Sequence, residues 1–181
     1  MPLNSAGSVA LLESGIPPTS EEARGPKRIE VNPDLLVEDG FQLTRQGRFE
    51  ASAEKYYAAL KLNPEHPKAL WNLGFALNRL GRYKEAVQTL DQGLATKGGN
   101  RASMFYERSY AHSYLKQYDE ALSDIDEAIR IRPDSFQFLW QRARVHSFRG
   151  EDEAAKSDAK KVLQLNPAHA GALRLAAEGM Q

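Results

Sequence analysis

Apolar and small residues recur along the chain at spacings that indicate pairs of amphipathic helices. From Pro67 to Leu94 they return every three or four positions, are interrupted at Gly81, and then resume the same spacing. Such a pattern is typical of a helix, a tight break and a second helix, because one face of each helix then buries its apolar side chains.

This helix–break–helix unit recurs four times, which indicates a repeat protein. The pattern of the unit at 67–101 returns 34 residues apart, with one extra residue absorbed near Gly98. At the start of the first unit, Asn32 suits a helix cap and Pro33 suits the first helical position. The units span residues 33–66, 67–101, 102–135 and 136–169.

A 34-residue period of this kind resembles the tetratricopeptide repeat family over residues 33–167. Small residues occupy the places where the two helices of a unit approach closely, and prolines stand where the chain enters the next unit. These motif positions are Gly40, Gly74, Ser109 and Ala143, then Ala86, Ala121 and Ala155, then Pro64, Pro133 and Pro167.

The resemblance implies an all-α fold, a right-handed α-solenoid of four helix-turn-helix repeats. A further helix over 170–180 is expected to cap the apolar face that the last unit would leave open. Lys116 departs from the pattern, because it replaces the glycine that breaks the unit elsewhere. If Lys116 is left-handed, this replacement costs up to about 1 kcal/mol.

Composition narrows the function without naming a partner. The chain has 181 residues, no cysteine, and 24 basic against 24 acidic residues. Zero net charge gives no general attraction to nucleic acid, and no apolar run is long enough to insert into a membrane. Residues 1–32 are rich in glycine, proline and serine and are interpreted as a flexible N-terminal tail. We expect a cytoplasmic protein.

No arrangement of residues indicates catalysis, so we expect a non-enzymatic protein without a cofactor. His112 and His146 hold the same place in consecutive units and allow two interpretations. They could form a metal pair, or each could be satisfied by a hydrogen bond. The second interpretation is favoured, because no third ligand is placed beside them.

The first helix of each unit carries the candidate binding residues. In the family, the fifth and ninth residues of a unit point into the concave face, and a spacing of four keeps them and the thirteenth residue on one line. Because the ninth place is usually polar in the family, aromatics there favour a binding groove. The predicted groove residues are Val37, Phe41, Trp71, Phe75, Arg79, Tyr106, Tyr110, Tyr114, Trp140, Arg144 and Phe148.

The clamp that some family members use for acidic C-termini is not predicted here. Of its positions only Asn72 matches, and Val37, Phe41, Ser103 and Glu107 do not. Moving the register by one unit matches worse.

We therefore expect a protein-interaction scaffold or chaperone-like adaptor that binds a peptide segment in an aromatic-lined concave groove. One alternative is self-association or autoinhibition, with the N-terminal tail in the groove. Another is a secretion-type chaperone for apolar translocator proteins.

Overall fold

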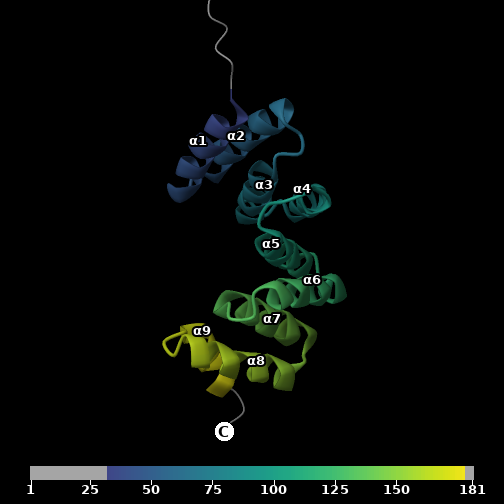
Figure 1. Ribbon diagram of the computed structural model, residues 1–181. Coiled ribbons are helices and arrows are strands. Elements are labelled where there is room, and N and C mark those ends of the chain that lie inside the picture. The colour runs from purple at the N-terminus through teal and green to yellow at the C-terminus, as the bar shows by residue number, and fades with distance from the viewer. Residues whose placement is uncertain (1–31, 178–181) are drawn as a thin grey trace, which may run out of the picture. The chain divides into compact units, whose positions relative to one another are not determined.

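A computed structural model describes residues 32–177 of the chain (Figure 1). This part consists of α-helices joined by short turns and contains no strand, which confirms the predicted all-α repeat solenoid. The predicted tail, apart from Asn32, and the end of the predicted capping helix lie outside the described residues. The helices are α1 (Pro33–Arg45), α2 (Phe49–Leu62), α3 (Pro67–Arg79), α4 (Tyr83–Ala95), α5 (Arg101–Tyr114), α6 (Tyr118–Ile131), α7 (Phe136–Arg149), α8 (Asp152–Leu165) and α9 (Ala170–Ala177).

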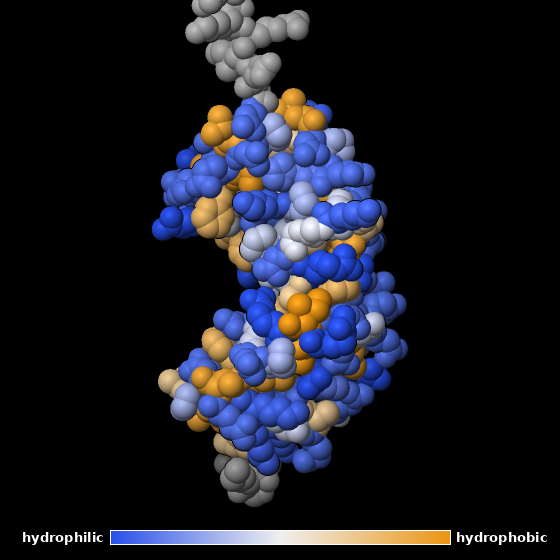
Figure 2. All heavy atoms as spheres, in the orientation of Figure 1, coloured by the Kyte–Doolittle hydropathy of each residue, from blue (hydrophilic) through white to orange (hydrophobic). Residues whose placement is uncertain are grey.

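The helices stack in chain order, each against the one before it. The first helices of successive units also touch one another, since α1 contacts α3, α3 contacts α5, and α5 contacts α7. The helices α1, α3, α5 and α7 therefore share one continuous side of the array. In the view of Figure 2 the visible face is mostly hydrophilic, carries several apolar patches, and is hollowed along one side.

Local sequence explains where the first helices begin. Asn32 accepts a hydrogen bond from the Asp34 amide at 2.8 Å, and Pro33 occupies the first turn, where its missing N–H costs nothing. Asn100 caps α5 in the same way, through the Ser103 amide at 3.1 Å. The α5 helix begins at Arg101, the last residue of the second unit as the sequence divides it.

The break within each unit is the same hydrogen-bonded turn. In the first unit the Arg48 amide donates to the Leu43 carbonyl at 3.0 Å across a left-handed residue, as in a Schellman motif. The left-handed residue is glycine in three units and Lys116, with φ 60°, in the third. Lys116 therefore meets the condition under which its replacement of glycine was expected to cost stability.

Small residues allow the two helices of a unit to pack closely. A Cβ added to Gly74 would lie 2.6 Å from Leu90 of α4, and one added to Gly40 would lie 2.6 Å from the Tyr56 ring. In the third unit Ser109 fits because its hydroxyl donates to the Ala121 carbonyl at 2.8 Å. The sequence prediction that these positions set the close approach is confirmed for these units.

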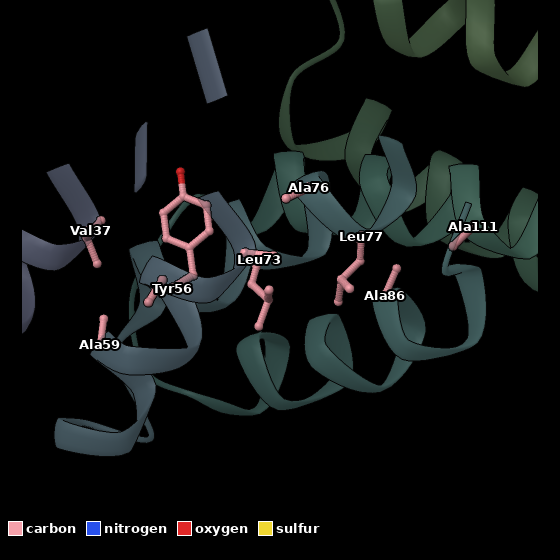
Figure 3. Packing of buried hydrophobic residues seen from close by; sticks show 10 residues of the cluster. Val37, Tyr56, Ala59, Leu73, Ala76, Leu77, Ala86 and Ala111 are labelled. Carbon is pink, nitrogen blue, oxygen red and sulfur yellow. The ribbon is translucent and has the colours of Figure 1, made fainter. Parts of the chain in front are cut away.

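The core runs between the layers of helices as successive clusters. The largest one runs from α1 to α5 and includes Val37, Tyr56 and Leu73, as Figure 3 shows. Further clusters lie between α5, α6 and α7, around Ile125, and between α7, α8 and α9, around Val162. Each unit buries its apolar face against its neighbours, as repeat arrays do.

An arginine clip also joins neighbouring units at two junctions. Arg108 of α5 bonds Asp124 of its own unit at 2.8 Å and Asp91 of the preceding unit at 2.6 Å. Arg142 repeats this arrangement in the next unit, with Asp158 and Asp126 each at 2.7 Å. The bonds tie three helices together through one partly buried guanidinium.

The junction between the first two units lacks this clip. Leu73, Thr89 and Tyr57 take the places of the arginine and its two aspartates. A depression of about 670 Å³ lies there, with all three residues in its lining. The first junction is therefore held by apolar packing, whereas the later two add ion pairs.

We predict that Lys116→Gly raises the free energy of unfolding by about 0.5–1 kcal/mol, measured by urea denaturation. Glycine relieves the left-handed strain, although it also adds freedom to the unfolded chain. Lys116→Ala is the matched control, since it keeps a Cβ and should bring no gain. Equal effects of the two substitutions would contradict the proposed strain.

We predict that Asp124→Asn lowers the free energy of unfolding by about 2–3 kcal/mol, because it leaves the partly buried Arg108 with one carboxylate. The control is Glu127→Gln, which breaks an exposed pair with Arg130 and should cost less than about 1 kcal/mol. Denaturant melts of both variants provide the comparison. Similar losses would show that the clip contributes no more than a surface ion pair.

Candidate functional site

Aromatic rings and arginines from α3, α4, α5 and α7 meet along the side formed by the first helices. At the centre, the Tyr110 and Tyr114 rings lie 4.8 Å apart between centroids, and the Tyr83 ring stacks on Tyr114 at 4.7 Å. The guanidinium carbons of Arg79 and Arg144 lie 5.5 and 5.6 Å from the Tyr110 centroid. Two cations from different units thus meet over one ring.

The contacts continue in both directions from this centre. Arg79 lies 4.6 Å from the Phe75 centroid, and Arg144 lies 5.6 Å from that of Phe148. We call this set the aromatic–arginine row. Its members are Phe75, Arg79, Tyr83, Tyr110, Tyr114, Arg144 and Phe148.

Two further aromatics flank the row, and both begin second helices. The Phe49 ring packs edge-on against Phe75 at 6.2 Å, and the Tyr118 ring lies 6.4 Å from Phe148. Together with Tyr83, these residues were missing from the predicted groove. A signal for them is present in the sequence, because an aromatic recurs at the first position of the second helix in three units and is replaced by Asp152 in the fourth.

The predicted residues at the fifth place of each unit are positioned differently. Val37 is 6% exposed and belongs to the core, so it offers almost no surface to a ligand. Tyr106 stacks on Phe138 of α7 at 5.2 Å, and Trp140 packs against His169 at 4.7 Å. Trp71 is partly buried, and its Nε1 has no hydrogen-bond partner among the described residues. Tyr106 and Trp140 thus pack against elements that follow their own helices in the chain.

Phe41, from the ninth place of the first unit, is 41% exposed and makes no ring contact with the row among the described residues. The row therefore covers the second, third and fourth units. At its far end a depression of about 260 Å³ is lined by Trp140, Arg144, Phe148 and Arg174, with Gly171 of α9 against the Trp140 ring.

The electrostatics of the row are set by its hydrogen bonds. The Tyr110 hydroxyl donates to the Tyr114 Oη at 3.3 Å, and Arg144 Nη2 donates to the same oxygen at 3.3 Å. Burial and this donated bond raise the pKa of Tyr110 to about 12. The bonds that Tyr114 accepts from Tyr110 and Arg144 lower the pKa of its phenol.

A buried carboxyl group lies behind the row, between α3 and α5. Glu107 is 5% exposed, and Asn78 Nδ2 donates to its Oε2 at 2.9 Å. Burial raises the pKa of Glu107, and the Asn78 bond only partly opposes this effect.

His112 and His146 are each hydrogen-bonded to a side chain five residues ahead. His112 Nδ1 lies 2.9 Å from Gln117 Oε1, and His146 Nδ1 lies 2.6 Å from Glu151 Oε2. The favoured interpretation of satisfied histidines agrees with these contacts.

Comparison with known proteins places the chain in the tetratricopeptide repeat family, to which it belongs. Family models described as tetratricopeptide repeat match residues 43–106, 102–135 and 136–169. This family comprises protein-interaction scaffolds, and that general class applies to the chain. No described helix has the length and apolar character to cross a membrane.

The similarity to individual relatives covers only part of the length of each relative. Sperm-associated antigen 1 of Homo sapiens is 32% identical over 54% of this chain and 10% of that protein. Small glutamine-rich tetratricopeptide repeat-containing protein 2 of Saccharomyces cerevisiae is 31% identical over 64% of this chain and 31% of that protein. The chain thus spans a third or less of these curated relatives.

The fold is also found in solved structures. That of YrrB, described as a TPR protein with an unusual peptide-binding site, superposes with a TM-score of 0.65 at 21% identity. The likeness covers 78% of this chain and 73% of that one, and it shows a common fold.

We predict that Glu107→Gln stabilises the protein more at pH 8 than at pH 4. Because burial raises the pKa of folded Glu107, its carboxyl favours folding below the unfolded pKa and loses that contribution as pH rises through the folded value. Glutamine cannot ionise, so its advantage should grow with pH. Urea denaturation at both pH values tests this, with the exposed Glu120→Gln as control. A pH-independent difference would contradict it.

Proposed function

We propose that the protein is a non-enzymatic adaptor that binds a peptide segment of another protein along the aromatic–arginine row. The proposal rests on the continuity of the row across three units. Phe75, Tyr110 and Phe148 come from different units, and contacts with two arginines connect their rings. A ligand lying on these residues would contact several helices at once.

The exposure of the row supports a binding role over a purely structural one. Tyr114 and Phe148 are 43% and 49% exposed, unlike the core residues that hold the units together. Tyrosine and arginine are also enriched at energetically important positions of protein interfaces. The relatedness to interaction scaffolds, and the peptide-binding site ascribed to YrrB, point in the same direction.

The polar groups of the row suit a peptide better than a purely apolar ligand. Arg79 and Arg144 present N–H donors beside aromatic faces, so backbone carbonyls can be bonded while side chains lie on the rings. An extended segment offers both kinds of group at regular intervals.

The proposal is tested with Phe75→Ala combined with Tyr110→Ala. Peptides are selected from a displayed library on the wild-type protein, and their affinities are then measured by calorimetry. Loss of two partly buried rings should weaken binding at least about tenfold, while the free energy of unfolding falls by roughly 2–4 kcal/mol and the helices stay folded at 25 °C.

The matched control is Tyr57→Ala, which removes an exposed ring from α2, away from the row. It should leave peptide affinity unchanged. The proposal is wrong if the library yields no peptide that competes at the row, or if the double variant binds as tightly as the wild type.

A further inference from the structure

Among the described residues, the Tyr114 hydroxyl accepts hydrogen bonds and donates none. A phenol has one O–H donor and two acceptor lone pairs. The Tyr114 oxygen already accepts from Tyr110 Oη and Arg144 Nη2. Its hydrogen must therefore point elsewhere, and the two incoming donors polarise it towards an acceptor.

The two arginines beside Tyr114 have no carboxylate within 4 Å in the described part of the chain. Arg144 instead bonds the Gln141 amide oxygen at 3.2 Å, besides Tyr114. The contrast with Arg108 and Arg142 is sharp, since these arginines of α5 and α7 each hold two aspartates.

Glu107 is the carboxyl group that acts on Arg79 from behind the row, and the charge of Arg79 opposes the rise in the Glu107 pKa that burial causes. Its carboxyl is buried behind the row and bonded by Asn78, and burial raises its pKa. The row thus combines two guanidinium groups and a polarised O–H donor, which is the set of groups that a carboxylate binds best.

The apolar parts of the row lie on both sides of this polar centre. Phe75 adjoins Arg79 on α3, whereas Phe148 adjoins Arg144 on α7. A ligand whose carboxylate sits at Tyr114 can therefore continue in both directions over an aromatic ring. This arrangement suits a side-chain carboxylate inside a segment better than the carboxylate at its end.

We propose that the row recognises an internal Asp or Glu flanked by apolar residues. Its carboxylate accepts a hydrogen bond from the Tyr114 hydroxyl and is held by Arg144, with added attraction from Arg79. This inference rests on the proposed peptide-binding function and specifies the ligand of the same site. The residues differ from those of the excluded clamp for acidic C-termini.

The test uses two blocked synthetic peptides, acetyl-Phe-Ser-Glu-Ser-Phe-amide and its Gln counterpart, in calorimetric titrations at low salt. In an extended chain, alternate residues share a face, so both rings and the carboxylate can reach the row. The Glu peptide should bind about tenfold tighter than the Gln peptide, as expected for charge-assisted hydrogen bonds.

Variants separate the hydroxyl from the charges. Tyr114→Phe keeps the ring and should reduce the preference for Glu several-fold, while Arg79→Gln combined with Arg144→Gln should abolish it. Because Arg79 and Arg144 also serve backbone carbonyls in the proposed function, the double arginine variant should weaken binding of both peptides, so the preference is measured as the ratio of the two affinities within each variant. The control Arg130→Gln removes one charge from the exposed face of α6 and should keep the full preference.

Equal affinity for both peptides in the wild type would overturn the carboxylate assignment. If that equal binding were lost in the Phe75→Ala, Tyr110→Ala protein, peptide binding by the row would still stand. Tighter binding of acetyl-Phe-Ser-Phe with a free C-terminus than of the Glu peptide would overturn the internal position. No binding of any of these peptides at millimolar concentration would overturn the inference as a whole.

Discussion

The close contact between the two helices of a unit determines which face of the first helix is buried. At Gly74 no Cβ can be accommodated beside Leu90, and at Gly40 none fits beside Tyr56. This contact fixes the rotation of the first helix, because only one of its faces can approach the second. The opposite faces of α1, α3, α5 and α7 are then left to contact one another and to form a shared surface. The aromatic–arginine row is therefore a consequence of the packing constraint.

The same rotation divides aromatic residues into structural and exposed groups. A residue at the fifth place points towards the next first helix, so Tyr106 stacks on Phe138 and Val37 enters the core. Residues at the ninth and thirteenth places, such as Tyr110 and Tyr114, lie about one and two turns further on and reach the surface. Their aromatic character does little for the helix contact, which makes it informative about binding.

Repeat number, helix order and the left-handed turn at Lys116 could all be predicted from the sequence, because each depends on residues within about one period. The exposed members of the row at the ninth and thirteenth places could be predicted for the same reason. Tyr83 belongs to the aromatics that recur at the start of the second helices, but its stacking on Tyr114 depends on how closely α4 approaches α5. The place of Val37 in the core likewise depends on contacts made by another helix. These features require the distances between elements, which no periodicity encodes.

Arginine shows most clearly how one residue type takes two roles in the same helices. Arg108 and Arg142 each bond two aspartates, one from their own unit and one from the preceding unit. Their positive charge is therefore paired in joining the units. Arg79 lies beside the Phe75 and Tyr110 rings, and Arg144 bonds the Gln141 amide oxygen and the Tyr114 hydroxyl. A guanidinium can stack on a ring at little desolvation cost while its N–H groups stay directed outward. Arg79 and Arg144 therefore stabilise the row while their positive charge remains available to a ligand. This charge is the basis of the proposed preference for an acidic ligand over a neutral one.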